Sequence, residues 1–200
     1  MFASSCQLFH AGARRWCNLS PVNTLILGGV RSGKSALAEQ LAAGGALPVV
    51  VVATARMPTD ADYELARRIA HHRARRPAAW VTVEEPLAVA AALAQHARPD
   101  VCVVVECLTL WLSNVLLERP LDARREIENL AAQVAQTPGE LLLVSNEVGQ
   151  GIMPDNALAR RFADLSGHLH RELAARCERV LLCVAGLPQV LKGNRDAALA

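Results

Sequence analysis

Short apolar runs alternate with segments of helical spacing along the chain from Thr24 onward. The runs are rich in Val, Leu and Ile and mostly lack a polar residue at every second position, which is typical of strands buried on both faces. Strands are therefore expected in TLILGG, LPVVVVATA, WVTVEE, VCVVVEC, GELLLVSNE and RVLLCVAG, at 24–29, 47–55, 80–85, 101–107, 139–147 and 179–186.

The segments between these runs have apolar residues three and four positions apart and a polar face, which predicts amphipathic helices. They are SALAEQLAA, DYELARRIAHHRA, PLAVAAALAQHA, LDARREIENLAAQVAQ and NALARRFADLSGHLHRELAARC, at 35–43, 62–74, 86–97, 121–136 and 156–177. This alternation predicts an α/β protein whose mostly parallel sheet is flanked by helices on both sides. A single domain is expected over residues 23–200, because no composition break follows residue 23.

Composition excludes several classes of protein. The chain has 200 residues, 52% of them hydrophobic, which argues against disorder. Its formal net charge of +2 is too small to predict a nucleic-acid partner. The six cysteines show no C-x-x-C spacing, which predicts reduced thiols in a cytoplasmic protein. No apolar run reaches the roughly 18 residues that span a membrane.

Residues 1–22 differ from the rest of the chain. They contain Ser and Arg but no Asp or Glu, a composition that superficially resembles a transit peptide. A disordered N-terminal extension explains the same composition, and we expect this alternative.

The most specific motif is LILGGVRSGKSALAEQLA, at 25–42. It matches G-x-x-x-x-G-K-[ST] between a predicted strand and a predicted helix, the context of a phosphate-binding P-loop. Backbone N–H groups and the positive end of the helix would bind phosphate oxygens. Lys34 would reach the β- and γ-phosphates, and the Ser35 hydroxyl would bind Mg²⁺. The expected nucleotide contacts are Gly28, Gly29, Val30, Arg31, Ser32, Gly33, Lys34 and Ser35.

A second Mg²⁺ contact is expected at the end of a neighbouring strand. Glu106 ends the run VCVVVE and is the best candidate, although a strand-end carboxylate can also cap the helix that follows. Motors, GTPase switches and small-molecule kinases share P-loop chemistry. The low net charge disfavours a nucleic-acid motor, and the lack of a convincing guanine-binding N-K-x-D disfavours a Ras-type switch. A kinase is therefore expected.

Two adjacent histidines stand in RRIAHHRARRP, at 67–77. On a helix over 62–74, His72 shares a face with Leu65 and Ile69, whereas His71 lies ~100° away on the polar side. An inward histidine can be a satisfied core residue. The neighbouring Arg73, Arg75 and Arg76 instead suit phosphate recognition and favour the neutral imidazole. Such an imidazole could attack an α-phosphate and form a phosphoramidate-linked nucleotide.

The motifs together resemble those of one family. LILGGVRSGKSALAEQLA, VVATA, RRIAHHRARRP, VVVECLTLWLSNVL, VSNEVGQGIMPDNALARRFADLSGHLHRELA and VAGLPQVLK occur in order between Thr24 and Lys192. This series is similar to the bifunctional adenosylcobinamide kinases and adenosylcobinamide-phosphate guanylyltransferases of cobalamin biosynthesis. The resemblance implies a P-loop fold with a RecA-like sheet and a homotrimer with active sites at subunit interfaces.

The resemblance also implies two reactions. The family phosphorylates the aminopropanol hydroxyl of adenosylcobinamide with ATP or GTP, and then transfers GMP from GTP through a histidine to the new phosphate. By position, that histidine would be His72. Further nucleotide contacts would be Ala53, Thr54, Ala55, Arg73, Ala74, Arg75, Arg76, Glu84 and Glu106. Either Glu84 or Glu106 could bind guanine through its N1–H and 2-amino donors.

Other interpretations stay open at this stage. The chain could be a simple P-loop kinase for another alcohol, with a structural His72, or a regulatory NTPase that senses nucleotide. The segment RMPTDADYELA, at 56–66, is longer than in the family pattern, and Glu106 stands where some relatives have Asp. Asn146 and Glu147 are candidates for corrinoid or phosphate contacts, because they stand at the carboxyl end of a predicted strand, where α/β folds bind ligands.

Overall fold

The computed structural model describes residues 22–56, 63, 66, 67, 70, 73, 74 and 76–193. Residues 1–21 of the expected extension and residues 71 and 72 lie outside this set. The elements in chain order are β1 (Asn23–Gly28), α1 (Lys34–Gly44), β2 (Val49–Ala53), β3 (Val81–Glu84), α3 (Val89–His96), β4 (Cys102–Glu106), α4 (Leu108–Glu118), α5 (Ala123–Gln136), β5 (Glu140–Asn146), α6 (Ala157–Arg176), β6 (Arg179–Val184) and β7 (Leu187–Lys192).

One seven-stranded sheet organises the described residues. Its strand order is β3-β2-β4-β5-β1-β6-β7. Neighbouring strands are parallel throughout, except that β7 is antiparallel to β6. The expected mostly parallel sheet is confirmed, and all six predicted strands are present. Burial on both faces is wrong for β3, because it is the outermost strand of the sheet and its residues are mostly exposed.

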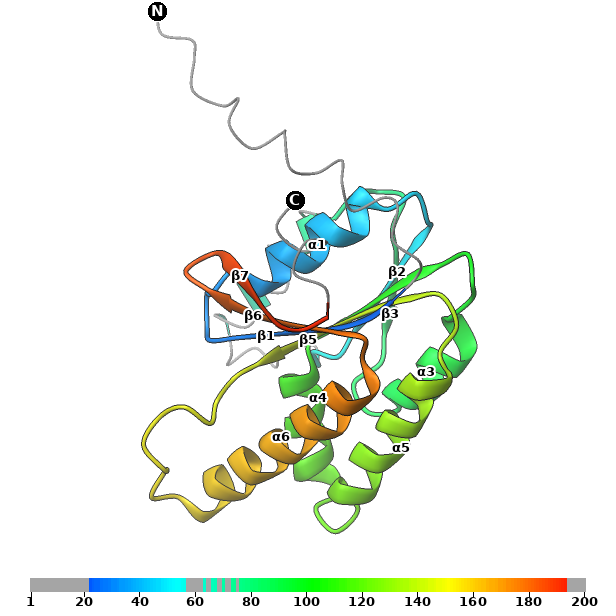
Figure 1. The fold of residues 1–200 in the computed structure, drawn as a ribbon. Helices are drawn as coiled ribbons and strands as arrows, with labels where there is room; N and C mark the ends of the chain where they lie inside the picture. The colour runs from blue at the N-terminus through cyan, green and yellow to red at the C-terminus, as the bar shows by residue number, and fades with distance from the viewer. Residues whose placement is uncertain are drawn as a thin grey trace, which may run out of the picture.

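Helices cover both faces of the sheet (Figure 1). Helix α1 packs on one face, where its apolar side chains join a core cluster with Ile26, Val104 and Leu142. Helices α3, α4, α5 and α6 cover the other face and form the larger cluster around Leu25 and Trp111. In the described part of the chain, no helix is long and apolar enough to cross a membrane.

Two elements have no counterpart in the sequence pattern. Helix α4 buries Leu108, Trp111, Leu112 and Val115 and has too few polar residues to show an amphipathic period. Strand β7 is a short edge strand that contains a proline and is mostly exposed, so it lacks the apolar run of the inner strands. Both form because tertiary packing and pairing outweigh weak local signals.

The turn between β6 and β7 supports the loop that precedes α1. Ala185 and Gly186 both have positive φ, at 52° and 82°, as a two-residue turn of type I′ requires. The Gly186 N–H donates to the Ser32 carbonyl oxygen at 2.8 Å. The C-terminal hairpin therefore fixes the position of the GGVRSGKS segment.

We expect Gly186→Ala to reduce the free energy of unfolding by about 1–2 kcal/mol, because an alanine Cβ is unfavourable at positive φ. An added Cβ would meet no atom within 4 Å, so the cost is conformational rather than steric. Gly186→Asn is the matched control, since asparagine tolerates the left-handed region. Urea unfolding of the two variants measures the difference, and equal losses would contradict this explanation.

Candidate functional site

Most of the expected site residues lie at one edge of the sheet. The carboxyl ends of the parallel strands meet there, and α/β folds bind ligands at that edge. Ala53 of β2 pairs with Glu84 of β3 on one side and with Glu106 of β4 on the other. Gly28 of β1 pairs with Asn146 of β5 at the same edge. The fold thus brings together residues from five strands that are separate in the sequence.

Close backbone contacts shape the loop between β1 and α1. A Cβ atom on Gly28 would lie 2.4 Å from Ser32 Oγ and 2.7 Å from the Cys183 carbonyl oxygen, so a larger residue does not fit. The Ser32 N–H donates to the Gly29 carbonyl at 3.3 Å. Ser32 Oγ is buried and has no hydrogen-bond partner among the described residues. A buried hydroxyl without a partner, in a glycine-rich turn, fits a loop that binds an anion.

Lys34 places a cation inside this loop. The residue is only 8% exposed, and its Nζ donates to the Gly29 carbonyl oxygen at 3.1 Å. No carboxylate of the described residues forms an ion pair with it. Burial lowers the pKa of Lys34, and the acidic groups of Cys107, Glu106 and Cys183 oppose that shift. Phosphate oxygens would supply the negative charge that this ammonium group lacks.

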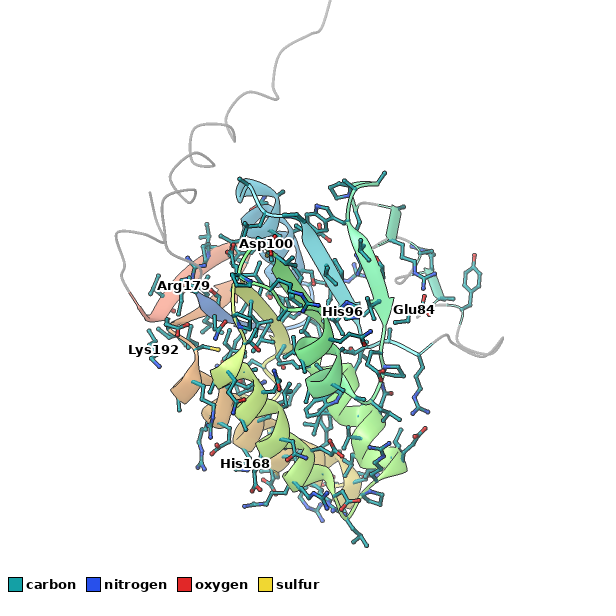
Figure 2. All side chains as sticks on the ribbon, turned by 90° about the vertical axis from the view of Figure 1, so that its right-hand side faces the viewer. Glu84, His96, Asp100, His168, Arg179 and Lys192 are labelled. Carbon is teal, nitrogen blue, oxygen red and sulfur yellow. The ribbon has the colours of Figure 1, made fainter. Side chains whose placement is uncertain are left out.

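Two arginines face the strand-end carboxylates. Arg76 Nη2 lies 3.4 Å from Glu106 Oε2, and the two side chains are only 9% and 13% exposed. Arg76 Nη1 also donates to Thr82 Oγ1 at 3.3 Å. Glu84 lies on β3, the outermost strand of the sheet (Figure 2). Its carboxylate forms an ion pair with Arg73, and both side chains are about half exposed. Arg73 and Arg76 therefore lie against the ends of β3 and β4, respectively.

The remaining residues of that segment are only partly described. His71, His72 and Arg75 lie outside the described residues, as does most of the helix expected over 62–74. Ala74 is described and exposed. The pairs formed by Arg73 and Arg76 nevertheless place the residues next to His72 in sequence at the candidate site.

Thr54, an expected nucleotide contact, connects the end of β2 to the end of β4 by hydrogen bonds. It is fully buried, and its hydroxyl donates to the Cys107 carbonyl at 2.7 Å and accepts from the Cys107 N–H at 2.8 Å. Its backbone N–H donates to the Glu106 carbonyl at 2.9 Å. The Asn114 side-chain amide donates to the Thr54 carbonyl at 2.9 Å. Sequence reasoning missed Asn114, although a polar residue in the apolar segment LTLWLSNVLL was a usable signal.

The end of β5 borders the loop between β1 and α1. The Glu147 N–H donates to the Gly28 carbonyl oxygen at 3.0 Å. The Asn146 amide Nδ2 lies 3.7 Å from Cys107 Sγ, which is a weak acceptor. Asn146 therefore stands between the β4 end and the loop, where an anion bound by the loop would offer a stronger acceptor.

The donor set of this edge fits Mg²⁺ in the presence of a nucleotide. Among the described residues, no group of three or more His, Cys, Asp or Glu side chains could hold a metal ion alone. The Ser35 hydroxyl lies in the first turn of α1, and the Glu106 carboxylate lies at the end of β4. These are oxygen ligands of the kind that Mg²⁺ prefers, and phosphate oxygens normally complete its coordination.

Known proteins are similar to this chain over most of its length. Residues 24–191 match the family described as cobinamide kinase / cobinamide phosphate guanyltransferase. The chain is 54% identical over 171 residues to the bifunctional adenosylcobalamin biosynthesis protein CobP of Pseudomonas aeruginosa, covering 85% of this chain and 97% of that protein. It is 37% identical over 184 residues to CobU of Salmonella typhimurium, covering 84% and 98%.

A solved structure supports the fold alone. An ATPase from the type III secretion system of pathogenic bacteria superposes with a TM-score of 0.51 at 11% identity, over 88% of this chain and 60% of that one. The shared fold agrees with the P-loop after β1 and the mostly parallel sheet. On the evidence of its sequence, the chain belongs to the cobinamide kinase / cobinamide phosphate guanyltransferase family.

Proposed function

We propose that this protein phosphorylates adenosylcobinamide with ATP or GTP and then transfers GMP from GTP to the product through His72. The observation that supports this best is the buried Lys34 ammonium, which lies in a glycine-rich loop without a carboxylate partner among the described residues. The family match supplies the acceptor, because a P-loop alone does not specify one.

In the first reaction, the aminopropanol hydroxyl of the corrinoid attacks the γ-phosphorus. The new O–P bond forms as the bond to the β-phosphate oxygen breaks, ADP or GDP leaves, and the hydroxyl proton is released to solvent. Lys34 and the backbone N–H groups of residues 28–35 bind the phosphates and offset the charge that develops on them. Mg²⁺, held by Ser35 and Glu106, would neutralise further phosphate charge.

In the second reaction, a neutral His72 nitrogen attacks the α-phosphorus of GTP and pyrophosphate leaves. A phosphate oxygen of adenosylcobinamide phosphate then attacks the same phosphorus, and the N–P bond breaks to regenerate the histidine. Arg73, Arg75 and Arg76 follow His72 directly and would stabilise the phosphate charge.

The two carboxylates suit different roles in this proposal. Glu106 is nearly buried and acts electrostatically on Lys34, which favours the phosphate and Mg²⁺ side of the site. Glu84 lies on the exposed edge strand, where its carboxylate could accept from guanine N1–H and the 2-amino group. The described residues Ala53, Ala55 and Ala74 would contribute backbone or apolar contacts to the nucleotide.

A homotrimer is part of the same proposal. Leu117 and Leu158 are 66% and 50% exposed, and both line an open cavity of about 390 Å³ between α4 and α6. Ile152 and Met153, in the segment that leads to α6, are 99% and 57% exposed. Exposed apolar side chains gathered in this way are typical of an interface between protein chains.

We also propose a cytoplasmic location. The described cysteines are all free thiols, as a reducing compartment would keep them. Burial raises the pKa of Cys102 and of Cys177 to about 12, which keeps these two thiols protonated and unreactive.

The covalent step is tested with GTP labelled on either the α- or the γ-phosphate, in the presence of Mg²⁺. After denaturing electrophoresis, we expect acid-labile label on the protein only from the α-position. The label should persist in His71→Ala and disappear in His72→Ala. Continued γ-phosphate transfer without any α-label would instead support a simple kinase, and nucleotide hydrolysis without transfer to cobinamide would support a nucleotide sensor.

Lys34→Met should reduce γ-phosphate transfer to adenosylcobinamide about a hundredfold or more, because the loop loses its cation at similar side-chain volume. Lys192→Met is the matched control. Its Nζ contacts the α6 carbonyls of Ala174 and Ala175, and Figure 2 shows it on the opposite side of the molecule from Glu84. Steady-state kinetics measure the effect, and comparable losses in both variants would contradict this role for Lys34.

Leu158→Glu should convert trimers to smaller species, because a carboxylate would be buried against apolar side chains at the proposed interface. Leu191→Glu, on the exposed β7, is the control for added charge. Sedimentation velocity gives the oligomeric state. A trimer that survives Leu158→Glu would exclude this surface as the interface.

A further inference from the structure

A chain of polar side chains crosses the apolar layer between β5 and α6. His170 of α6 is 8% exposed, and its Nε2 lies 2.8 Å from Ser145 Oγ. On the other side of the ring, Nδ1 lies 3.5 Å from Glu147 Oε2. Ser145 is fully buried and its hydroxyl is 3.3 Å from Thr109 Oγ1. Thr109 Oγ1 in turn accepts the Asn146 backbone N–H at 2.7 Å.

The two ends of this chain determine the direction of its hydrogen bonds. The backbone N–H of Asn146 can only donate, and the ionised carboxylate of Glu147 can only accept. Thr109 therefore donates to Ser145, Ser145 donates to His170 Nε2, and the imidazole proton lies on Nδ1 toward Glu147. Burial lowers the pKa of His170, with Glu147 opposing the shift, so the neutral ring keeps one donor and one acceptor.

This series of hydrogen bonds starts and ends on two consecutive residues, Asn146 and Glu147, at the end of β5. It holds the Asn146 backbone through Thr109 and the Glu147 side chain through His170. The same two residues contact the phosphate loop, because Gly28 pairs with Asn146 and accepts from the Glu147 N–H. Glu147 Oε1 also accepts the Gly149 N–H at 2.6 Å. A small displacement of His170 would therefore be transmitted to the border of the loop.

The Asn146 side chain is the group at this border that can meet a phosphate. Among the residues that the structure describes, its amide Nδ2 has only the weak acceptor Cys107 Sγ, at 3.7 Å, and Cys107 is close enough to Lys34 to affect the pKa of that lysine. A γ-phosphate oxygen bound near Lys34 would be a stronger acceptor for the same N–H. Successive side chains of a strand point to opposite faces, which places Asn146 opposite Ser145 and His170.

We propose that His170 is a positioning residue for phosphoryl transfer, and that it acts by holding the Asn146 amide against the γ-phosphate through Ser145, Thr109 and Glu147. This inference rests on the proposed kinase activity. It assigns no contact between His170 and the substrate. Its consequence is that the loss of His170 impairs γ-phosphate transfer more than it impairs nucleotide binding.

The test compares His170→Leu, which removes both polar contacts of the ring, with His170→Gln, which retains a donor and an acceptor. For His170→Leu, kcat for phosphorylation of adenosylcobinamide should fall roughly tenfold to a hundredfold, because the reacting groups are misaligned. The Kd for GTP should change less than about threefold, and acid-labile α-label should still form. His170→Gln should restore most of the lost kcat. His168→Leu, in the same helix, is the matched control (Figure 2).

A double-mutant cycle tests whether His170 acts through Asn146. If it does, adding His170→Leu to Asn146→Ala should reduce kcat by less than about threefold, because the positioned group is already absent. Independent, multiplicative losses would overturn the proposal, and so would an unchanged kcat in His170→Leu. If His170→Leu does not fold, Ser145→Ala interrupts the same series of hydrogen bonds with little loss of side-chain volume. The same changes in kcat and in the Kd for GTP, and the same cycle with Asn146→Ala, then test the proposal. A wild-type protein that transfers no γ-phosphate would instead refute the proposed function.

Discussion

The buried ammonium group of Lys34 is the constraint on which the rest of the site depends. Burial of a cation without a charged partner is unfavourable, and the described residues offer Lys34 only a carbonyl oxygen. Within the described part of the chain, the loop around it supplies further donors and the Ser32 hydroxyl, which has no hydrogen-bond partner there, but no negative charge in direct contact. This edge of the sheet is therefore complementary to a polyphosphate, which explains why the candidate residues from distant motifs converge on it.

The loop keeps its shape because the strands on both sides hold it. On one side, Gly186 in the β6–β7 turn donates to Ser32. On the other, Glu147 donates to Gly28. Beyond β5, the Thr54 hydroxyl bonds both backbone groups of Cys107, so the ends of β2 and β4 cannot separate. Rigid contacts of this kind preorganise backbone N–H groups for phosphate, which lowers the cost of binding and of reaching a charged transition state.

The arginines after the histidines have a role that their spacing alone does not show. Arg73 and Arg76 pair with Glu84 and Glu106, which stand on either side of Ala53 in the sheet register. These pairs orient the carboxylates and keep guanidinium groups beside the expected phosphates. The pair between Arg76 and Glu106 is nearly buried and weakly screened, whereas the pair on the edge strand is half exposed and contributes little to stability.

The fold class and the phosphate loop follow from the sequence by itself, because apolar strand runs, helical periods and G-x-x-x-x-G-K-S are local patterns. Local patterns do not predict α4, whose apolar sequence lacks a polar face, or the edge strand β7. The partners of Arg76 and the contacts of His170 with Ser145 and Glu147 were decided only by tertiary structure. These contacts join residues far apart in sequence, and strand register and the packing of α6 on the sheet determine which side chains meet.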